Sequence, residues 1–318
     1  QQCHQQRKHA HLATAWCRGH LGHELRRAAH DPIKFRQTDR DRPIVTLFTP
    51  RQKQAPALKR GIIDMIVCPP AYYNGLLSEA RLIGLQTKSL EELRANGAWD
   101  MMQEAWGKGL NAHMLAWVHH RGQKFYTYFN FKPKLSTKTG LDLTGVKVRS
   151  TGLYNALFRA MGATTNVISP GDIYAALERG VVKGLAWPWG AVRSYGWQKF
   201  VKYRIQPGFY GATMVTIVNK KKWQGLTEAQ RTLLTKQARI YEQTSDDIII
   251  RKAKVDDDVL QKAGVQFLDL KGDVRDAYIS TIYGAKWAEN DKVRKTGKVK
   301  FIIDYEKLKG LMYTKPGS

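Results

Sequence analysis

The sequence predicts an α/β protein of two lobes, in which helices flank two sheets and one long helix braces both lobes. A length of 318 residues exceeds what one small core needs and suits two lobes of ordinary domain size. Short apolar segments alternate with segments of helical spacing, which is typical of a parallel sheet covered by helices. A capping box at residues 227–230 opens a stretch without glycine or proline that continues to about Ala263. A helix of that length could span two lobes.

The first half of the chain contains five predicted strands and one long helix. Pro69 and Pro70 end one strand, because proline cannot donate to a strand ladder. Apolar spacing predicts a helix over residues 90–110. The strands are expected where β-branched and aromatic residues gather between turn residues, at residues 12–16, 43–48, 62–67, 114–117 and 125–129.

The second half repeats this alternation. A helix over residues 154–161 ends at Gly162, and another begins after the cap Ser169, with Pro170 in its first turn, and ends at Gly180. A last helix is expected over residues 273–286. The strands of this half are expected at residues 146–150, 165–168, 185–187, 212–219 and 265–270.

The composition excludes several classes of protein. No apolar run reaches the roughly 18–20 residues of a membrane-spanning helix. We expect any export signal to have been removed already, since none is visible at the start. The three cysteines show no CxxC spacing and define no disulfide framework. The net charge of +25 would suit nucleic acid as a partner, but the cations are spread along the chain without a zinc-finger or RNA-binding motif. A solvated basic surface is the simpler interpretation.

Signals for catalysis or metal binding are weak. The sequence has no GxSxG elbow, HExxH motif, phosphate-binding loop or GxGxxG fingerprint. His119 and His120 form an isolated pair at a strand end, and the N-terminal histidines lack metal-ligand spacing. We therefore expect no enzyme activity, no cofactor and no metal site.

Aromatic residues and one arginine stand where strands end. Ligands of open α/β sheets bind at the carboxyl ends of strands, so these side chains could line a cleft, although each could equally be a core residue. Arg149 closes the predicted strand 146–150 on the face opposite Val146 and Val148, where its planar fork could hold a carboxylate. The candidate ligand-binding residues are Arg149, Trp187, Tyr72, Tyr73, Phe125, Tyr210 (in a glycine-flanked turn), Trp16 and Trp189.

Several ordered segments make the chain resemble the DctP family, the solute-binding proteins of TRAP transporters. Residues 142–149 (DLTGVKVR) resemble the family's DLKGLKIR segment, and residues 59–65 (KRGIIDM) its RGxIDM segment. The resemblance covers about residues 11–270 and is weakest between residues 17 and 58. Further matching segments are YNALF at 154–158, MGA at 161–163, DIYAALERGVV at 172–182 and VNKKKW at 218–223.

The resemblance implies a two-lobed fold like that of periplasmic binding proteins, with a ligand cleft between the lobes. We expect residues 1–125 and 213–252 to form lobe I, and residues 126–212 and 253–318 to form lobe II. The implied function is capture of a small organic acid in the periplasm by Arg149, closure of the lobes, and delivery to the membrane permease subunits. The protein is expected to be a monomer that binds no nucleic acid. Handing the ligand to a receptor, as a sensor, is an alternative role.

Departures from the family pattern bear on the ligand. Phe125 stands where many relatives carry a second arginine, Trp187 replaces a polar asparagine, and Ala186 replaces a glutamate that helps keto-acid binders hold a cation. These changes favour a monocarboxylate with an apolar or aromatic body. The segment 36–54 is basic and glutamine-rich, and it lacks the family's usual PxGxLG pattern.

Overall fold

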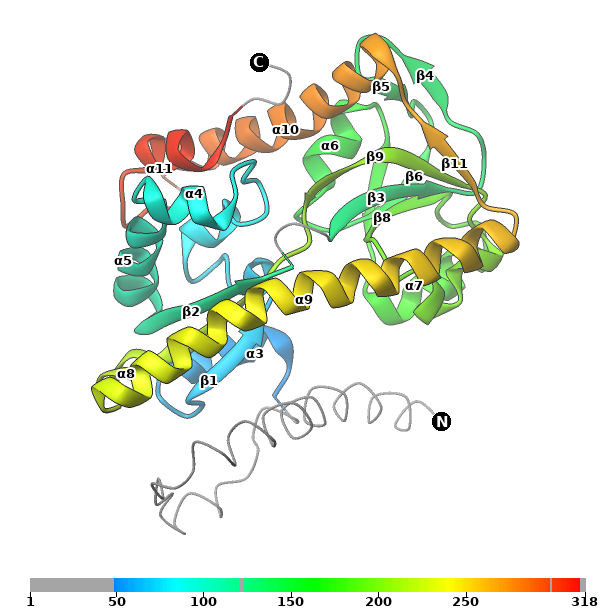
Figure 1. Cartoon of the computed structure of the whole chain (residues 1–318). Coiled ribbons are helices and arrows are strands. Elements are labelled where there is room, and N and C mark those ends of the chain that lie inside the picture. Colours follow the sequence, from blue (N-terminus) through cyan, green and yellow to red (C-terminus); the bar gives the residue numbers. More distant parts are fainter. Residues whose placement is uncertain (1–48, 120–122, 298, 315–318) are drawn as a thin grey trace. The chain divides into compact units, whose positions relative to one another are not determined.

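The computed structural model describes residues 49–119, 123–297 and 299–314 (Figure 1). Apart from the first residues of α3, the sheets and helices discussed below belong to the compact unit of residues 55–318. Two predicted strands, at residues 12–16 and 43–48, lie outside the described residues, and so does Trp16.

Two main sheets form the β-structure of this unit. The smaller has the antiparallel order β1-β10-β2, with strands Met65–Cys68, Met214–Asn219 and Ala112–Val118. The larger has the order β11-β9-β3-β8-β6-β7. Its strands, in the same order, are Gln266–Asp269, Tyr203–Gly211, Lys124–Phe129, Gly184–Pro188, Lys147–Ser150 and Thr164–Val167. A hairpin of β4 (Lys134–Ser136) and β5 (Gly140–Asp142) stands apart.

The prediction of a parallel sheet is correct only for part of the larger sheet. β6 pairs in parallel with β7 and β8, as strands joined through helices should. β3 pairs antiparallel with both β8 and β9, and every pair of the smaller sheet is antiparallel. The physical reason is that β10 is inserted between β1 and β2, which precede it by about a hundred residues or more along the chain, so the pairing is not set by local order.

The helices mostly follow the predicted pattern. The expected helix at residues 90–110 is instead two helices, because Gly97 adopts a left-handed φ of 86° between them. The last predicted helix extends to Lys295, and a further helix follows it. The helices are α3 (Arg51–Lys59), α4 (Leu90–Ala95), α5 (Ala98–Leu110), α6 (Asn155–Ala160), α7 (Ile173–Glu178), α8 (Lys220–Gln224), α9 (Glu228–Lys262), α10 (Gly272–Lys295) and α11 (Tyr305–Met312).

The segment around Tyr210 is a strand and not the predicted turn. The flanking glycines Gly208 and Gly211 suggested a turn, yet both lie inside β9, whose residues pair with β3. Phe209 faces Phe125 in this register. Proline and glycine are tolerated here because the register of β9 against β3 shifts near Phe125.

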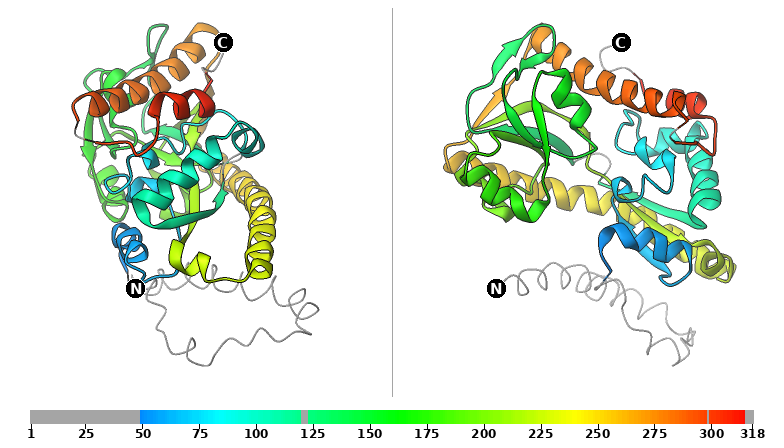
Figure 2. Two further views of the ribbon diagram at one scale, coloured as in Figure 1. Left: turned by 90° about the vertical axis from the view of Figure 1, so that its left-hand side faces the viewer. Right: turned by 180° about the vertical axis from the view of Figure 1, so that it is seen from behind.

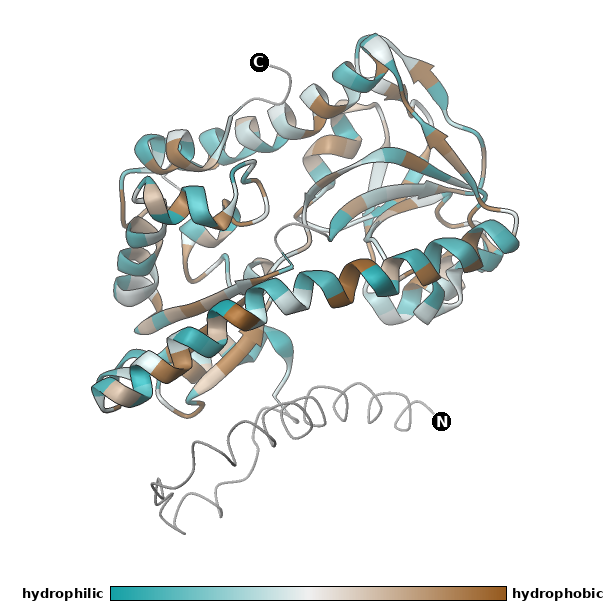
Figure 3. Ribbon diagram, in the orientation of Figure 1, coloured by the Kyte–Doolittle hydropathy of each residue, from teal (hydrophilic) through white to brown (hydrophobic). Residues whose placement is uncertain are grey.

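Helix α9 begins at the predicted capping box, with the Thr227 hydroxyl accepting from the Gln230 amide and the Gln230 side chain accepting from the Thr227 amide. It runs past the smaller sheet and continues toward α7 and the larger sheet (Figures 1 and 2). Most of its residues are hydrophilic, and hydrophobic residues gather near its middle (Figure 3). The expected long helix is therefore confirmed.

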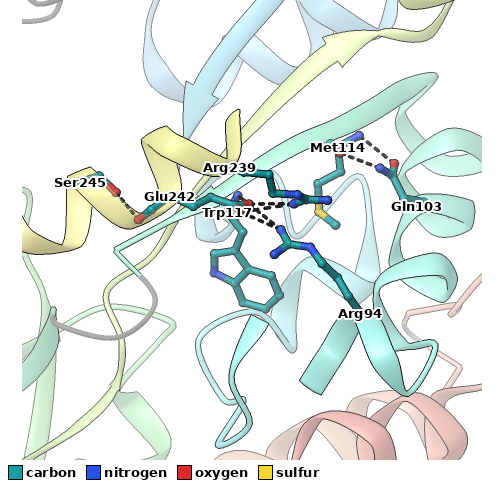
Figure 4. A network of polar contacts seen from close by, with 7 residues as sticks. All are labelled: Arg94, Gln103, Met114, Trp117, Arg239, Glu242 and Ser245. Atoms are coloured by element: carbon teal, nitrogen blue, oxygen red, sulfur yellow. Dashed lines mark hydrogen bonds and ion pairs between the residues drawn. The ribbon is translucent and has the colours of Figure 1, made fainter. Parts of the chain in front are cut away.

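A buried carboxylate attaches α9 to the smaller sheet (Figure 4). Both oxygens of Glu242 accept from Arg94 Nη2 at 2.8 Å, and Arg239 lies 3.2 Å away. Glu242 Oε1 also accepts the backbone amide of Trp117 on β2 at 2.9 Å. The Arg94 guanidinium is stacked on the ring of Trp99 at 4.3 Å, so this ion pair is partly shielded from water.

Two further carboxylates attach the other half of α9 to the larger sheet. Asp257 pairs with Arg204 of β9 and accepts from Trp189 Nε1 at 2.9 Å. The Arg204 guanidinium lies between the rings of Tyr126 and Phe267. Asp256 accepts the backbone amide of Arg193 at 3.2 Å.

Both faces of the larger sheet are covered. One face contributes Val148, Ala186 and Ile205 to the largest apolar cluster, which includes Tyr278 and Ile282 of α10. The other face contributes Tyr128 and Leu185 to a second cluster with α7. Alternation along β6 therefore places Val148 on one side and Arg149 on the other, as predicted.

The C-terminal segment packs beside α5 and the residues before it. Ile302 and Ile303 donate their amides to Glu79, the Leu311 carbonyl accepts from Asn96, and Thr314 donates to Thr87. Within the described ranges, no helix combines the length and apolar character required to cross a bilayer.

We predict that His113 makes the folded state sensitive to mild acid. Its ring is stacked on Trp223 with centroids 3.9 Å apart, and burial lowers its pKa to about 4. In the unfolded chain the pKa of His113 is about 6.5. As pH falls below that value, the unfolded chain binds a proton that the folded chain does not yet bind, so the free energy of unfolding decreases until pH reaches about 4. The side chain is partly exposed, which limits the loss to about 1–2 kcal/mol.

His113→Phe keeps the stacked ring and removes the titration. Urea unfolding at pH 7 and pH 4.5 should show that the variant loses about 1–2 kcal/mol less stability than the parent protein between the two conditions. Equal losses in the two proteins would contradict this account of His113.

Candidate functional site

The candidate site lies where several strands of the larger sheet end. β6 and β8 run in parallel, with Arg149 opposite Leu185, so their carboxyl ends meet at one edge. β3 begins at this edge, because Phe125 faces both Pro188 and Phe209. Arg149, Trp187, Phe125 and Tyr210 are thus brought to the same edge, where ligands of α/β sheets usually bind.

Arg149 is a buried guanidinium whose hydrogen-bonding capacity is only partly used. It is 2% exposed. Its Nε donates to the Ile168 carbonyl at 3.0 Å, which fixes the plane of the group. Its Nη1 has no hydrogen-bond partner in the part of the chain that the structure describes. A buried donor without a partner costs about 1–3 kcal/mol, and more when it is charged, so the site is poised to accept an oxygen ligand.

The surroundings of Arg149 are aromatic and hydroxylic. Burial lowers the pKa of Arg149, and the neighbouring hydroxyl groups of Tyr154, Tyr72 and Tyr195 oppose that shift. Burial likewise raises the pKa of Tyr154, while the charge of Arg149 opposes the rise. Within the described ranges, the largest influences that oppose the shift come from tyrosine hydroxyls and not from an acidic side chain.

A group of three aromatic rings forms one side of the site. The Arg149 guanidinium lies 5.2 Å from the Trp187 ring centre, within range of a cation–π contact. Trp187 packs edge-on against Trp197 at 4.7 Å and Tyr195 at 5.4 Å. The buried Trp187 Nε1 also lacks a partner within the described ranges, which leaves a second donor in the same neighbourhood.

The other predicted site residues divide into two groups. Tyr72, half-buried at the end of the short 3-10 helix Pro70–Tyr72, acts electrostatically on Arg149, and Phe125 contacts Tyr154 with ring centres 5.3 Å apart. Tyr73 and Tyr210 point into the apolar core: Tyr73 accepts from Trp106, and Tyr210 donates to the Ile282 carbonyl at 2.7 Å.

Trp189 donates its Nε1 proton to Asp257 and packs against the Tyr126 ring. Trp16 lies outside the described residues. These placements group Arg149 with Trp187, Tyr72 and Phe125, and they show structural bonds for Tyr73, Tyr210 and Trp189.

Sequence reasoning did not single out Tyr154, Tyr195 or Trp197 as site residues. Tyr154 follows Arg149 by five residues, at the turn between β6 and α6, and that position at the carboxyl end of a strand is a usable signal. Tyr195 and Trp197 lie in two short 3-10 turns after β8, where the sequence shows no regular period. Only the fold brings them to Trp187.

The described residues contain no group of three histidine, cysteine or acidic side chains that could hold a metal ion. His119 adopts a left-handed φ of 61° after β2, and His120 lies outside the described residues. What the site offers chemically is hydrogen bonding to an anion beside aromatic walls.

The sequence pattern of the bacterial extracellular solute-binding proteins of family 7, named DctP, matches residues 43–283. The chain therefore belongs to this family, which confirms the resemblance seen in the sequence segments. The family and the fold are those of transport solute-binding proteins and not of enzymes.

Individual relatives agree with this assignment. The chain is 30% identical over 144 residues to the monocarboxylate 2-oxoacid-binding periplasmic protein of Nostoc sp. strain PCC 7120; the match covers 37% of this chain and 39% of the length of that protein.

Solved structures show the same two-lobed fold. A TRAP periplasmic solute-binding protein of Ochrobactrum anthropi, with its C-terminus bound in the ligand-binding pocket, superposes with a TM-score of 0.64 at 19% identity, covering 79% of this chain and 83% of that one. A TRAP periplasmic solute-binding protein of Ralstonia eutropha H16 with bound (S)-2-acetolactate gives 0.61 at 20% identity, covering 82% of each chain.

We predict that Arg149→Met leaves the stability of the ligand-free protein unchanged or raises it. The substitution removes a buried charge that has no acidic partner in the described ranges, and it keeps much of the side-chain volume. Replacing buried charges by apolar groups of similar size is often neutral or stabilising, by about 1–4 kcal/mol. Chemical denaturation of the ligand-free proteins measures the difference. A loss above about 2 kcal/mol would show that Arg149 has a mainly structural role.

Proposed function

We propose that the protein captures a small organic carboxylate in the periplasm and delivers it to the membrane permease of a TRAP transporter. One observation carries the proposal: Arg149 is a buried cation with an unpartnered terminal nitrogen at the edge where strands β6 and β8 end. A carboxylate oxygen is the natural acceptor for that donor, and a charge-assisted bond is stronger in a site from which water is excluded.

The ligand we propose is a monocarboxylate with an apolar or aromatic body. Apart from Arg149 itself, the side chains grouped around it are the aromatic residues Trp187, Tyr195, Tyr154 and Tyr72. Phe125, in the position of a second arginine in many relatives, packs on Tyr154 and supplies no charge. A second carboxylate on the ligand would therefore lose its hydration without gaining a cationic partner. The similarity to a monocarboxylate 2-oxoacid-binding protein supports the same choice.

The proposed cycle uses the two lobes that the fold provides. Tyr72 comes from the part of the chain around the smaller sheet, whereas Arg149, Tyr154 and Trp187 belong to the larger sheet. A ligand that contacts both sides would favour the closed arrangement by its differential contacts. The lobe boundaries expected from the sequence remain part of this proposal.

We predict that apolar monocarboxylates bind and C4 dicarboxylates do not. Isothermal titration calorimetry with 4-methyl-2-oxopentanoate and phenylacetate should give saturable binding, while succinate and malate should bind at least about 100-fold more weakly. Tight binding of succinate or malate, with none of either monocarboxylate, would refute the ligand class.

Arg149→Ala should weaken the binding of 4-methyl-2-oxopentanoate by at least about 100-fold, since losing a buried charge-assisted bond costs about 3 kcal/mol or more. The matched control is Arg159→Ala on α6, which removes an exposed arginine ten residues away along the chain and should leave affinity unchanged. Ligand-induced thermal shift gives an independent measure. Retained affinity in Arg149→Ala would overturn the assignment of the anchor.

A further inference from the structure

Lys286 is a buried lysine on α10 that the proposed binding site does not include. The residue is 3% exposed. Its ammonium donates to the backbone carbonyl of Gly152 at 3.0 Å and pairs with Glu289, one turn further along the same helix. Burial lowers the pKa of Lys286, and the Glu289 charge opposes this shift. Burying an ammonium is costly, so both partners are needed to compensate for it.

The Gly152 carbonyl belongs to the turn that connects Arg149 to Tyr154. Inside this turn the Thr151 carbonyl accepts the amides of Tyr154 and Asn155, at 3.1 and 3.0 Å. The Thr151 hydroxyl accepts the amide of Leu153 at 3.2 Å. These bonds shape the turn but do not fix it to the rest of the molecule. The bond from Lys286 links it to a helix 134 residues away in the sequence.

Helix α10 is itself firmly attached to the larger sheet. The Tyr278 hydroxyl lies 3.1 Å from Thr127 Oγ1 on β3, and the Ile282 carbonyl accepts from Tyr210 of β9. Tyr283 packs against the Tyr210 ring at 5.2 Å. Lys286 therefore extends from a rigid element, and rigid support of a binding residue is what keeps its geometry within the narrow range that binding needs.

We propose that Lys286 is a positioning residue for the carboxylate site. Its ammonium holds the turn 151–154 in place through the Gly152 carbonyl. That turn carries Tyr154, and its position keeps the Tyr154 hydroxyl beside Arg149. This inference rests on the proposed function for its effect on affinity. The effect on the turn itself is a property of the ligand-free protein and can be measured separately.

The test compares two variants that each remove one half of the ion pair between the buried Lys286 and the partly exposed Glu289. Lys286→Met keeps the apolar stem and removes the ammonium that holds Gly152. Glu289→Gln, the matched control, perturbs the same pair but leaves the bond to Gly152 in place. Both variants are expected to lower the Tm, so a loss of stability alone does not distinguish them. They differ in whether the turn 151–154 is released.

In the ligand-free proteins, amide hydrogen exchange at Tyr154 and Asn155 should be at least about 10-fold faster in Lys286→Met and within about threefold of the parent in Glu289→Gln. For 4-methyl-2-oxopentanoate, calorimetry should show about 10-fold weaker binding in Lys286→Met, and Lys286→Arg, which restores a cationic donor, should recover most of it. Should Lys286→Met fail to fold, Lys286→Gln takes its place in the same comparison with Glu289→Gln.

Unchanged exchange at Tyr154 and Asn155 in the lysine variant would overturn the proposal. Faster exchange with unchanged affinity would overturn the link between the turn and the ligand. If the parent protein binds none of the acids, the proposed function fails, and the exchange comparison still decides the role of Lys286.

Discussion

Three carboxylates of α9, of which Glu242 and Asp256 are buried and Asp257 is partly buried, are the constraint on which the arrangement of the two sheets depends. Glu242 joins the helix to β2 and α4, whereas Asp256 and Asp257 join it to β9 and the turns after β8. Each carboxylate would be expensive to bury alone, so each fixes the position of the arginine or backbone amide that compensates it. A helix held in this way at both halves is a continuous support for both sheets. Its middle, between Asp246 and Ala253, carries no buried residue.

Arg149 differs from these carboxylates, because its buried charge is only partly compensated by its neighbours. Arg204, buried to a similar degree, has a carboxylate partner and two aromatic rings around it, although its Nε lacks a hydrogen bond within the described ranges. Arg149 has one backbone carbonyl, neighbouring hydroxyls and an unpartnered Nη1 within the described ranges. Sequences that fold well satisfy their buried charges, and exceptions concentrate at functional sites. The difference between these two arginines of the same sheet is therefore the carboxylate: Arg204 pairs with Asp257, and Arg149 has no such ion pair within the described ranges.

Local patterns predicted the parts of the fold that local interactions determine. The cap of α9, the alternation that sets Arg149 opposite Val148 and the parallel pairing around β6 were all readable from short segments. The antiparallel insertion of β10 was not, since its partners are distant in the chain. Strand β9 was missed because Gly208 and Gly211 around Tyr210 have the composition of a turn, and only pairing with β3 makes the segment a strand.

The candidate site was predictable to the same extent. Arg149 could be named because its chemistry and its strand end coincide in one segment. The sequence could not separate Tyr72 from Tyr73, although they are adjacent: Tyr73 turns inward to accept a bond from Trp106, 33 residues further on, and Tyr72 remains half-buried near Arg149. The same holds for Tyr210, whose hydroxyl finds its acceptor 72 residues away.

Long-range bonds of this kind decide which aromatic residues support the structure and which can contact a ligand. Lys286 belongs with them, because its acceptor lies in the turn that carries Tyr154 and its own helix is fixed by Tyr278 and Tyr210. Through β9 and α10, Tyr210, which first suggested a cleft, becomes part of the support for the turn beside Arg149. A tyrosine that never touches the ligand can thus still set the geometry in which the ligand is held.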